Sequence, residues 1–581
     1  DQKLENLLNL ALETTQEERK RSLNLNVGYE EEGDRWDLLI RFMGESRTLA
    51  EAFPEIRITP LLGNYAVVTL PQSRIEEFSR LSQVIYVEKP KRLFFAVDQG
   101  RAVSCISPVW QPPFSLSGRG ILVACIDSGV DYAHPDFRKE DGTTRILALW
   151  DQTIQGKPPE GYLIGAEYGE TQINQALQAG EKEEREQLVP SRDLSGHGTA
   201  VAGIAAGNGR GSAGRQFRGT APSADLVIVK MGAPREEGFP RTTELMLGVD
   251  YVVRKAIELR KPIAINISFG NTYGSHDGTS LPERFLNDIS SIWKNVICVG
   301  SGNEGTSAGH AAGRLSDDEE EEVQLAVQER EPALNVQIWK SYVDEVEFSV
   351  ISPSGVRAGP FQEILGPQRF VLGGTELLLY YGEPKPYSVK QEIYISFIPV
   401  RSYIDSGVWR LALTPRRIVD GRWEMWLPAQ ASLNEGTAFL RPDSSLTLTI
   451  PSTAALVVTV AAYDARTFSY ADFSGRGPES LYESGGAPKP DLAAPGVRVN
   501  APVPGGGYRE FSGTSFAAPF VTGSAALLME WGIVQGNDPY LYGEKVKAYL
   551  RRGAKELPGY DKWPNAQLGY GALCVKDSIP Q

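Results

Sequence analysis

The 581-residue sequence contains few residues with sulfur or imidazole side chains: four cysteines, four histidines and five methionines. Cys105, Cys125, Cys298 and Cys574 are far apart and lack the spacing of metal ligands, so they indicate no metal site. Cys125 and Cys298 lie inside apolar runs. We expect all four cysteines to be buried, reduced thiols rather than a disulfide framework.

Long hydrophobic runs and an excess of basic charge are also missing. No apolar run reaches the roughly 18 residues of a membrane-spanning helix, and no span is expected. Lys and Arg number 59 against 73 Asp and Glu, and the net charge of −14 disfavours nucleic acid as a partner. The hydrophobic content of 41% is ordinary for a globular protein, and the length predicts about three domains.

The first 99 residues are predicted to form a small α+β domain. Alternating or apolar segments at Trp36–Phe42, Tyr65–Leu70 and Val84–Val87 are typical of strands, and Ser73 can cap a helix between the last two. The following segment, Lys89–Gly100, has little periodicity and is interpreted as an extended connector. We therefore place a domain boundary at residue 99.

Repeated strand-then-helix segments follow the connector. Apolar runs predict buried strands, and helices lie between some of them; the strands are Ile121–Ile126, Leu226–Val229, Ile263–Ile267, Val296–Val299 and Leu456–Ala462. This order predicts an α/β fold, a doubly wound parallel sheet with functional residues at the carboxyl ends of its strands. We assign residues 100–314 and 451–581 to this domain.

A different pattern interrupts that domain. An acidic run at 317–322 marks the boundary, and short alternating segments separated by turn residues continue to residue 450. They predict an inserted β-sandwich or jelly roll at 315–450. The contiguous acidic residues lack the spaced ligands of a calcium loop, so neither a metal site nor a cofactor is expected.

Four residues at strand or helix ends have complementary chemistry. Asp127 ends a buried strand, His197 opens a helix within Gly-His-Gly, and Ser515 opens another after Gly513-Thr514. A serine nucleophile needs a base, and the base needs a carboxylate that holds its tautomer. Asn303, just after a strand, can donate its amide to an oxyanion beside the Ser515 N–H. Taken alone, each of three residues also has a purely structural interpretation: Asp127 as a loop aspartate, Ser515 as an N-capping serine and Asn303 as a turn asparagine.

In these residues the chain resembles the subtilisin-like serine peptidases. Ile126-Asp127-Ser128-Gly129-Val130, Gly196-His197-Gly198-Thr199 and Gly513-Thr514-Ser515-Phe516-Ala517-Ala518-Pro519 look like the three catalytic blocks of that family, and Ser301-Gly302-Asn303 looks like its oxyanion block. All four occur in the Asp, His, Ser order of the family. The resemblance implies a serine endopeptidase with Asp127, His197 and Ser515 as triad and Asn303 as oxyanion donor.

The same resemblance implies further site residues. Asn266-Ile267-Ser268-Phe269-Gly270 resembles the strand that pairs with substrate, so Ser268, Phe269, Gly270, Gly300, Ser301 and Gly302 are expected around the S1 pocket. The N-terminal domain resembles a prodomain that acts as chaperone and bound inhibitor. We expect self-cleavage within Phe94–Arg101, at the Gln99–Gly100 bond.

The β-rich insertion is similar to that of the Csp germination proteases of clostridia. That resemblance implies a protein substrate, a spore cortex-lytic pro-enzyme, and favours an extracellular or spore-associated location; a monomer is expected. Because some Csp members have lost triad residues, the alternative is a silent pseudoprotease scaffold or germination signal receptor. A carbohydrate-binding role of the insertion would use Trp339, Trp409, Trp423 and Trp426, which are equally typical of a core.

Overall fold

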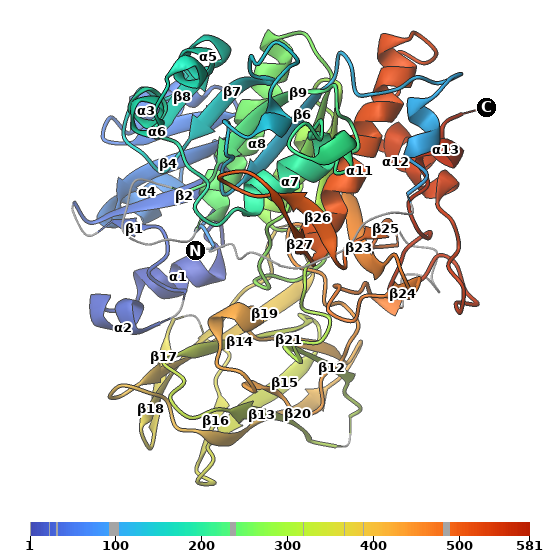
Figure 1. The fold of residues 1–581 in the computed structure, drawn as a ribbon. Coiled ribbons are helices and arrows are strands. Elements are labelled where there is room, and N and C mark those ends of the chain that lie inside the picture. The colour runs from blue at the N-terminus through green and yellow to red at the C-terminus, as the bar shows by residue number, and fades with distance from the viewer. Residues whose placement is uncertain are drawn as a thin grey trace. The chain divides into compact units, whose positions relative to one another are not determined.

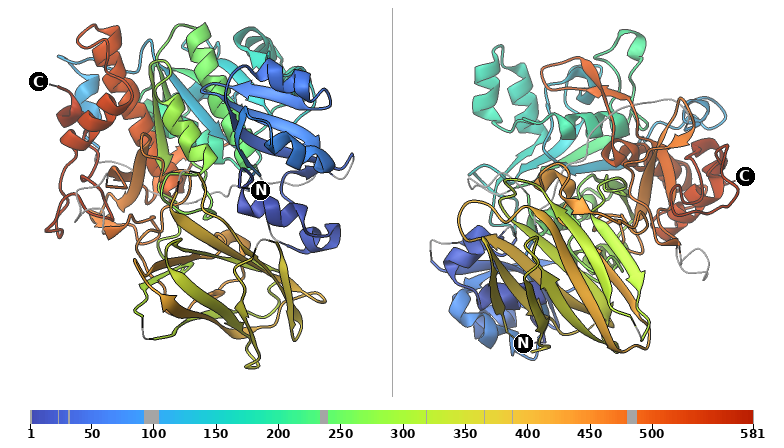
Figure 2. Two further views of the ribbon diagram at one scale, coloured as in Figure 1. Left: turned by 180° about the vertical axis from the view of Figure 1, so that it is seen from behind. Right: turned by 90° about the horizontal axis from the view of Figure 1, so that it is seen from below.

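The computed structural model describes residues 2–22, 24–30, 33–91, 104–232, 240–317, 319–364, 366–386, 388–479 and 488–580. Unit 1 comprises residues 1–92, 271–281 and 304–450, and unit 2 comprises residues 93–270, 282–303 and 451–581. Figure 1 labels most of the helices and strands of both units, and Figure 2 shows them from two further sides.

The N-terminal part of unit 1 is an antiparallel sheet packed against short helices. The strands follow the order β1-β2-β4-β3, and β5 also pairs with β2. Trp36, Leu38 and Ile40 of β2 are buried in the core that the sheet shares with the helices. The elements are α1 (Asn6–Leu12), α2 (Gln16–Arg21), β1 (Tyr29–Glu30), β2 (Arg35–Phe42), α3 (Ser46–Ala52), β3 (Arg57–Leu61), β4 (Tyr65–Pro71), α4 (Ile75–Ser79) and β5 (Val84–Glu88).

The rest of unit 1 is built from two antiparallel sheets around one apolar core. One sheet has the order β12-β21-β14-β19-β18-β17 and the other β16-β15-β20-β13-β22. The strands are β12 (His310–Arg314), β13 (Glu321–Val327), β14 (Leu334–Ser341), β15 (Glu345–Ile351), β16 (Arg357–Phe361), β17 (Gln368–Leu372), β18 (Thr375–Tyr381), β19 (Lys390–Pro399), β20 (Gly407–Arg417), β21 (Arg422–Trp426) and β22 (Ala438–Phe439). Trp339, Trp409, Trp423 and Trp426 are all buried.

The two parts of unit 1 share a hydrophobic core. Leu378 and Tyr380 of β18 are buried in the same cluster as Leu7 and Leu8 of α1. Arg21 of α2 forms an ion pair of 3.3 Å with Glu376. Residues 2–91 are therefore held by the inserted sheets through both apolar and charged contacts.

Unit 2 contains a largely parallel sheet of the order β24-β23-β11-β10-β6-β9-β7-β8, with β25 paired to β23. Only β8 and β24 run antiparallel to their neighbours. The strands are β6 (Leu122–Asp127), β7 (Ile146–Asp151), β8 (Ala166–Gly169), β9 (Asp225–Lys230), β10 (Ile263–Ile267), β11 (Asn295–Gly300), β23 (Val458–Asp464), β24 (Ser469–Tyr470) and β25 (Leu492–Pro495); β26 (Val499–Pro502) and β27 (Tyr508–Phe511) form a separate hairpin.

Helices cover both faces of this sheet, as the doubly wound prediction requires. Val123 and Cys125 of β6 pack in one core with α7 and α11, whereas Ile126 faces Gly248 of α8 on the other side. The helices are α5 (Glu170–Gln178), α6 (Lys182–Leu188), α7 (His197–Ala206), α8 (Thr242–Glu258), α9 (Leu281–Ile289), α11 (Thr514–Met529), α12 (Glu544–Gly553) and α13 (Val575–Ser578).

No membrane span is expected from the sequence, but one segment of the described residues has the length and the apolar composition of a span. It is Thr514–Val534, which has 21 residues and contains α11. The glycines and polar residues within it conceal its length in the sequence. Because 83% of its most apolar window is buried inside the protein, this segment is the core helix of unit 2.

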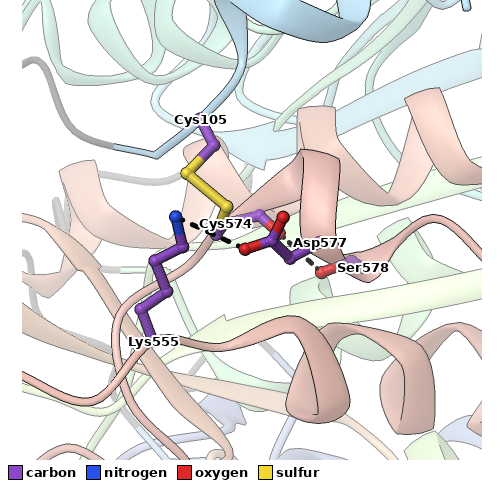
Figure 3. The surroundings of a disulfide bond; sticks show 5 residues. All are labelled: Cys105, Lys555, Cys574, Asp577 and Ser578. Atoms are coloured by element: carbon purple, nitrogen blue, oxygen red, sulfur yellow. Dashed lines mark hydrogen bonds and ion pairs between the residues drawn. A yellow bond between two sulfur atoms is a disulfide. The ribbon is translucent and has the colours of Figure 1, made fainter.

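The prediction of four reduced thiols is wrong, because Cys105 and Cys574 form a disulfide. They are 469 residues apart in the chain, but the fold brings their Cα atoms to 4.8 Å. A backbone hydrogen bond from Val575 N–H to the Ser104 carbonyl joins the same two segments. Figure 3 shows the bond beside α13, where Lys555 pairs with Asp577 at 3.3 Å. Cys125 and Cys298 are buried, unpaired thiols as predicted.

Candidate active site

Asp127 and His197 are brought together by the end of β6 and the start of α7. The His197 Nδ1 atom lies 2.6 Å from Asp127 Oδ1, which also accepts the Ser128 N–H at 2.8 Å. Both side chains are buried, with 4% of His197 and 1% of Asp127 exposed. This contact fixes the orientation of the imidazole and suits the carboxylate to stabilise an imidazolium.

The approach of α7 to β6 depends on glycine. A Cβ atom at position 198 would lie 2.1 Å from the Gly129 carbonyl oxygen and 3.1 Å from Asp127 Oδ1. Gly196, just before the helix, has a φ of 76°, in the left-handed region. The Gly-His-Gly pattern thus lets the helix begin within hydrogen-bond distance of the strand end.

Asp193 ties these two elements to each other, a role that the sequence did not reveal. Its Oδ1 accepts the Ser128 hydroxyl at 2.8 Å and the Gly196 N–H at 2.9 Å. Its Oδ2 accepts the N–H and hydroxyl of Thr199 at 2.8 and 2.7 Å. The only signal in the sequence is an aspartate shortly before a helix, which is typical of many N-terminal caps.

Ser515 occupies the first turn of α11. Gly513 before it has a φ of 140°, a conformation that side chains rarely adopt. The Ser515 hydroxyl donates to the Ser268 carbonyl at 3.1 Å, and the Ser268 hydroxyl donates to the Ser515 carbonyl at 3.0 Å. The N-terminus of α11 places the positive end of the helix dipole beside this hydroxyl.

The aromatic ring of Phe516 brings the serine segment next to the histidine. The ring centroids of His197 and Phe516 are 5.1 Å apart, and α7 and α11 lie side by side in the core and in Figure 1. Three residues that are widely spaced in the sequence, Asp127, His197 and Ser515, therefore lie on adjoining segments of unit 2.

Asn303 is oriented by Thr514. Its Oδ1 accepts the Thr514 N–H and the Thr514 hydroxyl, both at 3.1 Å. With the amide oxygen engaged, the amide NH₂ is the part of Asn303 available to an oxyanion beside Ser515. The Gly302 N–H donates to the Thr514 hydroxyl at 3.1 Å and completes this arrangement.

The residues predicted around the S1 pocket lie at the carboxyl ends of two neighbouring strands. Ser268 to Gly270 follow β10 and Gly300 to Gly302 surround the end of β11, and these strands pair in parallel. A Cβ at position 300 would lie 3.1 Å from the backbone of Thr514, so glycine permits this close approach. The Ser301 hydroxyl pairs with Ser474 at 3.1 Å, so Ser301 can line a pocket only through its backbone.

The two residues of the predicted self-cleavage site, Gln99 and Gly100, lie outside the described residues.

Neither the buried cysteines nor a metal site adds a further candidate for catalysis in the part of the chain that the structure describes. Burial raises the pKa of the Cys298 thiol to about 12 and that of Cys125 further, so neither suits a nucleophilic role. Among the described residues, no group of three or more His, Cys, Asp or Glu side chains is arranged to hold a metal ion.

Comparison with known proteins agrees with this geometry. A model described as "Subtilase family" matches residues 118–336 and 429–571, and one described as "Csp protease B prodomain" matches residues 2–91. The solved Clostridium perfringens CspB protease is 36% identical, with a TM-score of 0.74 over 82% of this chain and 95% of that chain.

Curated relatives are more distant. A PII-type proteinase of Lactococcus lactis subsp. cremoris is 24% identical in an alignment 520 residues long, which covers 82% of this chain and 26% of that protein. The minor extracellular protease Vpr of Bacillus subtilis is 23% identical in an alignment 495 residues long, which covers 80% of this chain and 52% of that protein. This chain thus spans about a quarter of the lactococcal proteinase and about half of Vpr.

Proposed function

The chain belongs to the subtilase family of serine peptidases, and on that premise we propose that it hydrolyses peptide bonds of protein substrates through a triad of Asp127, His197 and Ser515. The observation that carries this proposal is the 2.6 Å contact of His197 with Asp127. His197 opens α7, which packs beside α11, and Ser515 lies in the first turn of α11. Ser515 attacks the carbonyl carbon and His197 takes its proton, while Asp127 stabilises the imidazolium.

The charge on the carbonyl oxygen is then bound by two donors, the Asn303 amide and the Ser515 N–H. The hydrogen bonds from Thr514 support this role, because they hold the amide oxygen away from the oxyanion. His197 next protonates the leaving amine, and water hydrolyses the acyl-enzyme. Ser268 to Gly270 and the backbone of Gly300 to Gly302 would border the substrate.

Labelling with a fluorophosphonate tests the nucleophile directly. We expect wild type to be labelled and to hydrolyse a casein or peptide substrate, and Ser515→Ala to do neither. A matched control is Ser524→Ala on the same helix, whose hydroxyl donates only to the Phe520 carbonyl at 2.6 Å. Absence of Ser515-dependent labelling would favour the alternative of a pseudoprotease scaffold or signal receptor.

The same site would first cut its own chain at the Gln99–Gly100 bond, and the prodomain would stay bound as inhibitor. Support comes from the match of residues 2–91 to a Csp prodomain and from their packing against the inserted sheets. The domain scheme is then a prodomain at 1–99, a peptidase at 100–314 and 451–581, and a jelly roll at 315–450. Intact mass tests the cut, which Ser515→Ala should abolish.

The physiological substrate that we propose is a spore cortex-lytic pro-enzyme, cut by a monomeric, extracellular or spore-associated peptidase. The resemblance to Csp germination proteases and the likeness to the C. perfringens CspB protease support it. Incubating the mature protein with such a pro-enzyme should give one discrete cleavage. Casein hydrolysis without cleavage of the pro-enzyme would reject this substrate and leave the peptidase proposal standing.

A further inference from the structure

A cavity of about 630 Å³ lies in unit 2 close to the candidate active site. Its walls are the loop after Asp127 at residues 130–135, part of α6, the segment 191–194 before His197, and the turn of the β26–β27 hairpin at 504–506. The cavity therefore adjoins both segments that carry Asp127 and His197. None of the proposed catalytic steps uses it.

Two carboxylates in this cavity are already engaged with the backbone. Asp131 accepts the Ala133 N–H at 3.0 Å and the Gly505 N–H at 2.9 Å. Asp193 accepts the Gly196 and Thr199 N–H groups at 2.9 and 2.8 Å. These carboxylates hold the walls together and leave little capacity for the cations around them.

Arg138 and Arg185 line the same cavity, and neither forms an ion pair with a carboxylate within the described part of the chain. Arg138 donates through Nη2 to the Ala133 carbonyl, while its buried Nε has no hydrogen-bond partner. Burial and the charge of Arg185 lower the pKa of Arg138. The positive charges of Arg185 and Arg210 act on Arg138 in the same direction as burial, and the carboxylate of Asp131 acts against them.

Two further cations at the rim share one carboxylate. Arg192 pairs with Glu186, and Lys182 lies 3.7 Å from the same side chain. The cavity therefore has four cationic side chains, and Glu186 is the one lining carboxylate whose partners are side-chain cations rather than backbone groups. An anionic group would relieve this excess of positive charge.

We propose that this cavity, the cationic subsite, binds an acidic side chain of the protein substrate close to the scissile bond. The inference rests on the proposed peptidase function and adds a substrate class to it. A substrate side chain is favoured as the source of the carboxylate because the wall 191–194 runs directly into His197. Leu194 at this wall is 85% exposed and offers apolar contact to an extended peptide.

Matched peptides that differ by Glu or Gln at one position flanking the scissile bond test the proposal. In wild type we expect Glu to raise kcat/KM roughly five-fold over Gln at one position, as for a partly exposed charge pair of about 1 kcal/mol. Arg185→Gln should bring this ratio to about one. Arg185→Glu should bring it below one, because the new carboxylate repels the Glu peptide. The Arg185 side chain makes no hydrogen bond or ion pair in the described structure, so these variants should fold.

The matched control is Arg552→Gln on α12, which removes one positive charge at the opposite end of unit 2 in Figures 1 and 2. It should retain the wild-type ratio. Raising NaCl to about 0.5 M should also weaken the preference in wild type, because partly exposed charges are screened. Equal hydrolysis of Glu and Gln peptides at every position, or a Glu preference that survives in Arg185→Gln, would overturn the proposal.

Affinity measured with Ser515→Ala separates this inference from the peptidase proposal. Fluorescence anisotropy of labelled Glu and Gln peptides reports binding without catalysis. Tighter binding of the Glu peptide that Arg185→Gln abolishes would support the cationic subsite even if wild type hydrolysed nothing. Hydrolysis of both peptides without any difference in affinity would leave the peptidase proposal intact and reject the subsite.

Discussion

Thr514 holds Asn303 by two hydrogen bonds, one from its N–H and one from its hydroxyl, each 3.1 Å from Asn303 Oδ1. The residue before the proposed nucleophile thus orients the proposed oxyanion donor. Ser515 lies in the first turn of α11, and Asn303 is held by Thr514 in the same turn. The positions of the nucleophile and of the oxyanion donor therefore depend on one local structure. A change at Thr514 can therefore affect catalysis without removing any catalytic group.

Thr514→Val keeps the shape and the N–H of this residue but loses the hydroxyl. We expect kcat to fall roughly five-fold with little change in KM, since one hydrogen bond of about 1 kcal/mol no longer orients the Asn303 amide. Steady-state hydrolysis of a short peptide measures both constants. Thr514→Ser, which keeps the hydroxyl, is the control and should stay near wild type. An unchanged kcat in Thr514→Val would contradict the orienting role.

Asp193→Asn should weaken the connection between the end of β6 and the start of α7. The asparagine keeps one oxygen acceptor and turns an NH₂ group towards N–H groups that need an acceptor. We expect kcat/KM and the rate of fluorophosphonate labelling to fall roughly ten-fold, because the His197–Asp127 geometry loosens. Asp472→Asn is a suitable control, since Asp472 is exposed and accepts only the N–H of Phe473.

Peptide KM separates positioning from general damage in this experiment. A reduced kcat with an unchanged KM and an unchanged melting temperature would support the positioning role of Asp193. A fall in melting temperature that accounts for the lost activity would instead make Asp193 a purely structural residue.

The strand and helix ends that carry Asp127, His197 and Ser515 could be predicted from the sequence. Buried parallel strands appear as continuous apolar runs, and small residues mark where a helix can start close to another backbone. Asp193 could not be found in this way, because its partners are backbone groups whose direction depends on the folded loop. The pair Cys105 and Cys574 escaped for a similar reason, since their 469-residue separation leaves no local signal.

The assignment of residues to the two units also could not be predicted from the sequence. Residues 271–281 come soon after β10 in the chain, but they belong to unit 1. The Tyr273 hydroxyl donates to Glu392 at 2.9 Å, and the Gly274 N–H donates to Gln337 at 2.9 Å. Contacts of this kind join segments that are far apart in the sequence, and strand or helix periodicity contains no information about them.

Reduction of the disulfide should destabilise unit 2. The disulfide joins the segment around Cys105 to Cys574 at the start of α13. Replacing both cysteines by alanine should lower the free energy of unfolding by about 2–4 kcal/mol, which would be measured as a lower melting temperature. Native alkylation followed by mass spectrometry gives an independent measurement. Before reduction no thiol should react, because Cys125 and Cys298 are buried; after reduction only Cys105 and Cys574 should react. Labelling of Cys105 without reductant would contradict the pairing.

His310 should make unit 1 sensitive to acid. Burial lowers the pKa of His310 to about 4 from the usual 6.5 of a histidine. Its ring stacks on Trp426 at 4.8 Å, and His276 stacks on the same indole at 4.3 Å. Because the folded pKa lies below the unfolded one, the unfolded state binds the extra proton first. Stability should thus be unaffected above about pH 6.5 and should fall as the pH decreases towards 4.

Melting temperatures followed by tryptophan fluorescence between pH 7 and pH 4.5 test this dependence. Wild type should lose more stability over that window than His310→Gln, whose amide does not titrate. Parallel curves for the two proteins would show that another group causes the acid sensitivity.

Lys91 lies between two buried carboxylates at the end of the N-terminal domain. Its ammonium is 2.6 Å from Glu5 and also pairs with Glu88; the exposed fractions of the three side chains are 8%, 1% and 0%. Lys91→Met would remove the ammonium that pairs with both carboxylates and leave them only the charge of Lys385 and two backbone N–H donors. This loss should cost about 3–5 kcal/mol of stability in unit 1. Glu5→Gln combined with Lys91→Met removes one of the stranded charges and should recover a substantial part of this loss.

Protection of residues 2–91 from a second protease gives the corresponding functional measurement. If these residues remain attached to the inserted sheets after the proposed self-cleavage, they should resist digestion in wild type and in the double variant. Lys91→Met should be digested faster, because buried carboxylates that have lost their ion-pair partner favour the dissociated state, where water solvates them. Equal protection in all three proteins would mean that the apolar contacts of α1 with β18 are sufficient, and that the charged cluster contributes nothing to retention.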